Sequence, residues 1–96
     1  MVKEVSYKKM TEYVGLMFCR ERIHQGITQE KVAESMQRLG FDIGQPAISK
    51  IEKGERNIYF PELCALLHIF DISLVDFAKY VYNIILTGKS NGWTVY

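Results

Sequence analysis

The sequence lacks any apolar run near the roughly 20 residues that a membrane-spanning helix needs. Lysines and a glutamate interrupt its first ten residues, so the apolar stretch of a signal peptide is missing as well. There is no excess of one charge, because 12 Lys and Arg stand against 11 Asp and Glu. We therefore expect a cytoplasmic protein without membrane contact, on which any surface for a polyanion is local.

Cysteine is scarce, and the two that occur lie far apart. Cys19 and Cys64 have apolar neighbours, and a cytoplasmic chain keeps its thiols reduced, so we expect two buried core residues. Cys19 with His24, and Cys64 with His68, suggest a zinc site as an alternative. That site requires the two loosely spaced pairs to face each other across the core. We expect no metal and no other cofactor.

The sequence also lacks the groups of residues that an enzyme needs. It has no paired carboxylates for acid and base chemistry and no glycine-rich phosphate loop. It has no Ser or Cys beside a His that a third residue orients. Its 96 residues suffice for one domain, and 48% of them are hydrophobic, which is typical of a folded chain. We expect one folded domain that is not an enzyme.

The chain divides into three parts. Residues 1–10 mix charged and apolar side chains without a clear period, and we expect an N-terminal arm. Residues 11–86 show apolar residues at helical spacing and no strand pattern longer than a few residues. Residues 87–96 form a tail that is polar at first and ends in Trp93, Val95 and Tyr96. The predicted fold is therefore an all-α domain with short flanking segments.

Capping residues, prolines and glycines divide residues 11–86 into five helices. The expected helices run from Thr11 to Gly26, from Thr28 to Gly40, from Pro46 to Gly54, from Pro61 to Phe70, and from Ser73 to Gly88. The fourth is apolar almost all round, so we place it at the centre of the core. The fifth, over 73–86, carries more apolar residues than one buried face requires. We expect this surplus and the tail to contact a second chain.

The third helix points Ile48 and Ile51 inward and leaves its polar side chains outward. An α-helix fits the major groove of DNA, and its outer side chains need donors and acceptors for the base edges. Glutamine can bond adenine through two atoms, lysine favours guanine, and serine can bond to various bases. The outward set predicts a surface for double-stranded DNA; it comprises Gln45, Ser49, Lys50 and Lys53.

Three segments, in this order and spacing, resemble the Cro/repressor-type helix-turn-helix proteins, also called the Xre family. They are GITQEKVA at 26–33, ISKIEKGER at 48–56, and the apolar stretch 63–74. The resemblance covers about residues 12–80. It implies a five-helix repressor-like domain with a helix-turn-helix, which binds operator DNA as a homodimer and regulates transcription.

The resemblance also implies roles for single residues. Gln29, at the start of the second helix, matches a glutamine that bonds a backbone phosphate. Arg22 and Glu52 match an ion pair that connects the first helix to the third. The base-facing positions are Gln45, Pro46, Ser49 and Lys50, and the loop that touches phosphate contains Arg56, Asn57 and Tyr59.

This chain departs from the family pattern in two places. The connection from Met36 to Gln45 is about five residues longer than in the shortest phage repressors, which affects the angle between the two helices. Pro46 replaces a polar side chain and cannot donate a hydrogen bond, so we expect an apolar contact there, such as with a thymine methyl group.

The predicted function is sequence-specific DNA binding by a transcriptional regulator, most simply a repressor. The alternative is a protein-interaction module, such as an antitoxin-like or anti-repressor subunit, which holds another protein through the helix at 73–86 and the tail.

Overall fold

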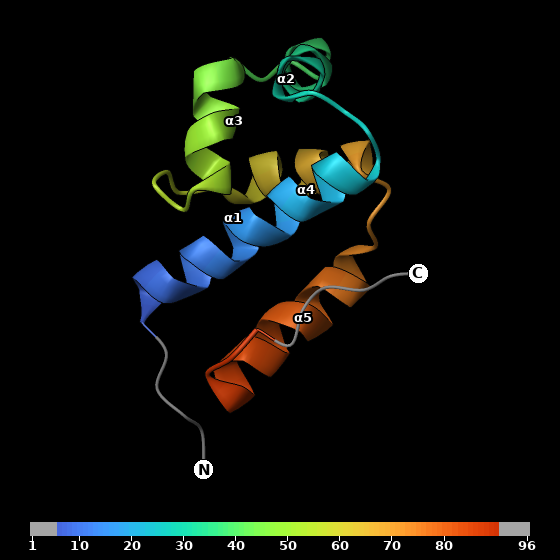
Figure 1. The fold of residues 1–96 in the computed structure, drawn as a ribbon. Coiled ribbons are helices and arrows are strands. Elements are labelled where there is room, and N and C mark those ends of the chain that lie inside the picture. Colours follow the sequence, from blue (N-terminus) through green and yellow to red (C-terminus); the bar gives the residue numbers. More distant parts are fainter. Residues whose placement is uncertain (1–5, 91–96) are drawn as a thin grey trace.

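The computed structural model describes residues 6–90, which form five α-helices and contain no strand. The helices are α1 (Tyr7–His24), α2 (Gln29–Arg38), α3 (Gln45–Glu52), α4 (Phe60–Ile69) and α5 (Leu74–Thr87). Helices α2 and α3 occupy one end of the molecule, α1 and α4 cross its middle, and α5 lies at the other end (Figure 1). The predicted all-α, five-helix fold is confirmed.

Most helix ends lie where their local residues indicated. The Thr28 hydroxyl accepts a hydrogen bond of 3.1 Å from the first turn of α2, and the Ser73 hydroxyl caps α5 in the same way. Pro46 and Pro61 lie in the first turns of α3 and α4, where no donor is lost. Gly88 ends α5 with a φ of 71°, a left-handed conformation that favours glycine. These caps depend on short-range chemistry, which explains why the sequence revealed them.

The start of α1 differs from the prediction. Residues 1–10 were expected to be an arm, but the helix begins at Tyr7, and the Ser6 hydroxyl caps it with a hydrogen bond of 3.0 Å. Thr11, the expected cap, lies inside the helix and donates its hydroxyl to the Tyr7 carbonyl at 2.9 Å. Threonine satisfies its hydroxyl within a helix in this way, so its presence did not mark a helix end. Residues 1–5 lie outside the described part.

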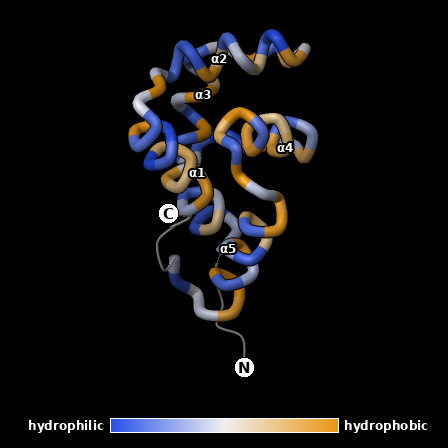
Figure 2. The backbone as a smooth tube through the Cα atoms, turned by 90° about the vertical axis from the view of Figure 1, so that its right-hand side faces the viewer, coloured by the Kyte–Doolittle hydropathy of each residue, from blue (hydrophilic) through white to orange (hydrophobic). Residues whose placement is uncertain are grey.

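The core lies between the helices and takes buried residues from all five of them. The Phe18 ring lies 5.9 Å from that of Phe70 and 6.0 Å from that of Phe77, so α1 contacts both C-terminal helices through aromatic rings. Met36 and Leu66 are completely or almost completely buried beside them. Figure 2 shows that α4 is more hydrophobic along its length than α2. Among residues 6–90, no helix combines the length and apolar character that crossing a membrane requires.

The two cysteines are less buried than predicted. Cys64 is exposed and Cys19 is partly buried. The error at Cys64 arose because α4, although apolar almost all round, is covered by the core on one side only. His68, one turn further along α4, is exposed as well. Within residues 6–90, no three His, Cys, Asp or Glu side chains gather where they could hold a metal ion.

Helix α5 buries one face and leaves the other uncovered. Phe77 and Ile84 are buried, and the Tyr80 hydroxyl donates a hydrogen bond of 3.2 Å to the Tyr13 carbonyl of α1. Val75 and Tyr82 are about two-thirds exposed, at 63% and 62%. The surplus of apolar residues that the sequence indicated is therefore present on the surface. The apolar end of the predicted tail, residues 93–96, lies outside the described residues.

Candidate nucleic-acid interface

The connection between α2 and α3 is ordered by its own hydrogen bonds. The Gln37 side chain donates to the Ile43 carbonyl at 3.0 Å, and the Phe41 amide donates to the Met36 carbonyl at 3.0 Å. Gly40 adopts a φ of 96°, and Ile43 is buried in the core. The long connection is therefore attached to α2 at one end and to the core at the other, which fixes the position of α3.

Helix α3 presents a polar outer face. Its inward residues Ile48 and Ile51 are each only 2% exposed, as the sequence indicated. Of the four side chains expected to face outward, Lys50 and Lys53 are exposed and Gln45 and Ser49 are partly exposed. Pro46, the other expected base-facing residue, is exposed as well. This face has the polar donors and acceptors that reading of a major groove requires.

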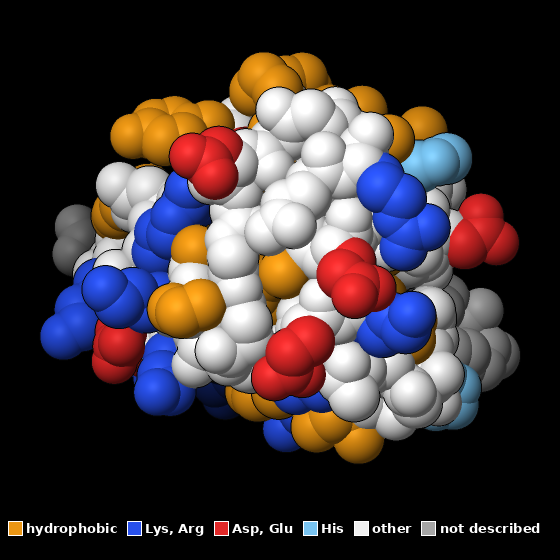
Figure 3. Space-filling model, turned by 90° about the horizontal axis from the view of Figure 1, so that it is seen from above, with side chains coloured by type: hydrophobic (Ala, Val, Ile, Leu, Met, Phe, Trp, Pro, Cys, Tyr) orange, Lys and Arg blue, Asp and Glu red, His pale blue; other side chains and the backbone are white. Residues whose placement is uncertain are grey.

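Charges of both signs surround this face. Figure 3 shows the end of the molecule that α2 and α3 occupy, with acidic and basic side chains spread around uncharged groups. On α2, Lys31 lies 3.4 Å from Glu34, and Arg38 lies 4.0 Å from the same carboxylate. Lys50 of α3 and Lys53, directly after it, form no ion pair within residues 6–90. The cations available to a polyanion on this face are therefore these two lysines.

An ion pair connects α1 to α3. The Arg22 guanidinium donates from Nε to Glu52 Oε2 at 2.7 Å and from Nη2 to Glu52 Oε1 at 3.1 Å. Its Nη1 donates to the Ile27 carbonyl at 2.9 Å, and the Glu52 side chain is only 6% exposed. The hydrogen bonds to Glu52 raise the pKa of Arg22, and burial together with Glu52 raises the pKa of the nearby Cys19 thiol. The C-terminal end of α3 is thereby fixed to α1.

Two glutamines extend this ion pair toward the outer face. Gln29 Nε2 donates to Glu52 Oε1 at 2.9 Å, and Gln45 Nε2 donates to Gln29 Oε1 at 2.7 Å. Sequence reasoning gave the two glutamines separate roles, whereas the structure joins them. No local signal could have revealed this contact, because it depends on how α2 and α3 cross.

The loop after α3 contains a second ion pair. Arg56 donates from Nη1 and Nη2 to the two Glu62 oxygens at 2.9 and 3.0 Å, and from Nη1 to the Asn57 carbonyl. Glu62 also accepts from the Tyr59 amide at 3.1 Å. Hydrogen bonds from Arg56 lower the pKa of Glu62, and Glu62 raises the pKa of Arg56. The sequence reading of Arg56 did not include this partner.

Asn57 is held from the first helix. The Tyr7 hydroxyl donates to Asn57 Oδ1 at 3.0 Å, a contact between residues 50 positions apart. This bond directs the amide oxygen toward Tyr7, and the Asn57 NH₂ group remains a donor at the surface. Residues of α3 and of the following loop also come together, since Pro46, Lys50 and Arg56 line one shallow hollow.

Comparisons with known proteins agree with this geometry. The family model described as Helix-turn-helix (HTH_3) matches residues 19–77, which is more than half of the chain and includes all of α2, α3 and α4. The chain therefore belongs to the Cro/repressor-type, or Xre, helix-turn-helix family, whose members are DNA-binding transcriptional regulators and not enzymes. No curated protein sequence matches this chain.

Solved structures show the same fold. The clp gene regulator ClgR from Corynebacterium glutamicum superposes with a TM-score of 0.65 at 18% identity, over 79% of this chain and 91% of that one. The restriction-modification controller protein C.Esp1396I, solved as a tetramer with its natural 35 base-pair operator, gives a TM-score of 0.65 at 24% identity. That match covers 85% of this chain and 99% of the controller protein.

Proposed function

We propose that this chain is a cytoplasmic repressor that binds operator DNA as a homodimer and reads the major groove with α3. The observation that carries the proposal is the outer face of α3, where polar side chains are exposed and one of them, Gln45, is held by Gln29. Family membership supports DNA as the partner. The controller protein C.Esp1396I, a relative in fold, was solved on its operator.

Base reading falls to the first two turns of α3. Gln45, Ser49 and Lys50 offer hydrogen bonds to base edges, and exposed Pro46 offers an apolar surface for a thymine methyl group. Lysine binds guanine acceptors, so Lys50 favours a G·C pair. Discrimination between sequences then rests on these side chains, and the phosphate contacts set only position and overall affinity.

Phosphate binding falls to side chains around α3. Gln29 retains one amide N–H at the N-terminal end of α2, where the helix dipole favours an anion. Lys53 and the Asn57 NH₂ group are exposed and follow the first two turns of α3 in the chain. Arg56 has five N–H donors and uses three on Glu62 and Asn57, which leaves two for a phosphate without loss of the ion pair.

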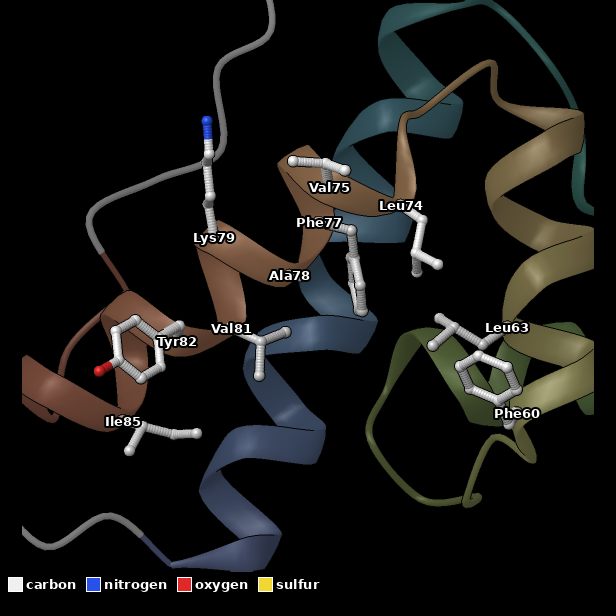
Figure 4. Close-up of a pocket in the computed structure, with 10 residues that line it drawn as sticks. All are labelled: Phe60, Leu63, Leu74, Val75, Phe77, Ala78, Lys79, Val81, Tyr82 and Ile85. Atoms are coloured by element: carbon white, nitrogen blue, oxygen red, sulfur yellow. The ribbon is translucent and has the colours of Figure 1, made fainter.

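The uncovered face of α5 supports a homodimer. A groove of about 670 Å³ lies between α4 and α5, and in Figure 4 Leu74 and Phe77 of α5 point toward Phe60 and Leu63 of α4. Phe60 and Val75 are 64% and 63% exposed, which is unusual for large apolar side chains of an isolated chain. A dimer places two copies of α3 in successive major grooves, about 34 Å apart.

Selection of bound sequences from a random duplex pool tests the proposed sequence-specific DNA binding. We expect a preferred site with two related halves, whose centres are separated by about 10 base pairs. Binding is then measured for this site and for unrelated duplexes by fluorescence anisotropy. A purified, folded chain that binds no duplex at low salt would overturn the proposal.

The same apolar face of α5 also fits a second function, that of a protein-interaction module of the antitoxin-like or anti-repressor kind. Val75→Lys distinguishes the two, with Leu16→Lys on the exposed side of α1 as the matched control. Loss of self-association together with weaker operator binding supports the homodimer. An unchanged oligomeric state in sedimentation, with loss of binding to a cellular protein, supports the module.

A further inference from the structure

We propose that Glu52 determines which atoms of Gln45 face the DNA, by fixing the direction of hydrogen bonding along a relay formed by Glu52, Gln29 and Gln45. This inference rests on the proposed function and adds a reading role to a residue otherwise assigned to an ion pair. Glu52 is a positioning residue, since it lies behind Gln29 and contacts no outer position of α3.

The relay begins at a group that accepts hydrogen bonds and is held in place. An ionised carboxylate has no donor. Arg22 binds both Glu52 oxygens, at 2.7 and 3.1 Å, and is itself attached to the Ile27 carbonyl. With its side chain 6% exposed, Glu52 has little access to water as a substitute partner. Its Oε1 therefore presents a fixed acceptor toward the end of α2.

The fixed acceptor orients the first glutamine. A glutamine amide has a donor end and an acceptor end of nearly the same shape, so its partners decide which way it points. Gln29 must turn its NH₂ group to Glu52, at 2.9 Å, and its oxygen therefore faces Gln45. The reverse orientation of Gln29 places an oxygen against the carboxylate and is strongly disfavoured.

The second glutamine follows the first. Gln45 Nε2 donates to the Gln29 oxygen at 2.7 Å, so one N–H of Gln45 is used within the protein. Its oxygen and its second N–H remain for the groove. Adenine presents one donor and one acceptor in the major groove, which is the complementary pair. The relay thus prepares Gln45 for an A·T base pair before DNA arrives.

A change at Gln29 has two effects on DNA binding, which the affinity for a single duplex does not distinguish. Loss of a phosphate contact by Gln29 weakens binding to all sequences alike, whereas loss of the relay frees the Gln45 amide to rotate and reduces base preference. The measured quantity is therefore a ratio of affinities at one position of the operator. Any general weakening cancels from this ratio.

The main variant is Gln29→Met, which keeps the length of the side chain, removes both relay bonds and leaves the ion pair of Arg22 and Glu52 intact. The Gln45→Ala variant first identifies the base pair that Gln45 reads. Wild-type protein and the variants are titrated against the selected operator and its three single-pair replacements at that position. Replacements at a base pair that Gln45→Ala leaves unaffected serve as the internal control.

We expect the wild type to prefer A·T at that pair by about five- to 150-fold. Gln29→Met should lower this preference at least threefold, leave the control pair unchanged, and have no further effect on preference in a Gln45→Ala background. Glu52→Gln, whose amide allows either direction, should lower the preference as well.

Four results would overturn the inference. They are an unchanged preference in folded Gln29→Met, an unchanged preference in folded Glu52→Gln, a preferred pair other than A·T, and a Gln45→Ala variant that alters no base preference. Thermal melts verify that each variant is folded, and Gln29→Met keeps the test decisive if Glu52→Gln unfolds. A wild-type chain that binds no duplex contradicts the proposed function instead.

Discussion

Lys50 is the residue of α3 from which a base contact can be tested most directly, because its charge is exposed and forms no ion pair within residues 6–90. Replacement by alanine should cost about 1–3 kcal/mol of binding free energy on the best operator and relax preference at one base pair. Titration against single-pair operator variants measures both effects. Lys89→Ala, which removes the same charge after α5, should change neither. Equal losses on every duplex would show that Lys50 contacts only phosphate.

Glu62 provides a pH-dependent test of the loop after α3. Arg56 lowers the pKa of Glu62 in the folded state, so the ionised form stabilises the fold above the ordinary glutamate pKa, about 4.3. This stabilisation is lost as the pH falls through the lowered value.

Glu62→Gln should therefore cost about 1.5–3 kcal/mol at pH 7, because a charged hydrogen bond is lost. The difference from the wild type should shrink below pH 4. Urea unfolding of both proteins at pH 7 and pH 3 measures it, and a difference independent of pH would show that Glu62 acts only through its shape.

At the scale of single residues, local chemistry could be predicted and long-range contacts could not. Thr28 and Ser73 cap helices through atoms two or three residues away, so their roles can be read from the sequence. The partner of Asn57 lies 50 positions away, and it is found only when α1 and the loop are placed together. The exposed or paired state of a site residue depends on such contacts.

At the scale of elements, the decisive feature is the close approach of α1 and α3. Gly15 is buried in α1, and a Cβ there would overlap the Ile51 carbonyl oxygen and lie 3.0 Å from that of Glu52. The missing side chain allows the backbone of α1 to touch that of α3 at Ile51 and Glu52.

Gly15→Ala should destabilise the fold by about 1–3 kcal/mol, since the overlap forces backbone movement. Without such contact, the same change in a helix would stabilise it by about 0.5–1 kcal/mol, so the sign of the effect tests the packing. Chemical denaturation gives the sign. Gly26→Ala is the comparison, because a Cβ at Gly26 meets no atom within 4 Å and costs only the strain of its positive φ of 70°.

Four of the five helices followed from periodicity and capping, whereas the start of α1 did not. Its first turn, from Tyr7, contains charged residues and a mostly exposed tyrosine, so it lacks the apolar period that identifies a helix. The Ser6 cap and a contact with a distant part of the chain, the hydrogen bond from Tyr7 to Asn57, hold it instead.

At the scale of the whole molecule, the near balance of charge determines how binding responds to salt. The formal charge is +1, and acidic side chains are interspersed with basic ones around α3 (Figure 3). If Lys53 and Arg56 neutralise one phosphate each per subunit, a dimer gives a slope of log K against log salt of roughly −3 to −4.

Anisotropy titrations between low and physiological salt measure this slope. Lys53→Ala should make it less steep by about 2 for a dimer, which carries two copies of the change. A wild-type slope near −10 would indicate many more phosphate contacts than this surface offers.

The unequal exposure of the two cysteines has a practical consequence. Cys64 is exposed on α4, whereas Cys19 is partly buried and its pKa is raised by burial and by Glu52, which lowers its thiolate fraction. A maleimide reagent at neutral pH should therefore attach to Cys64 first. Cys64 thus offers a preferred labelling position, from which fluorescence energy transfer could follow the proposed assembly and any DNA bending without an engineered thiol.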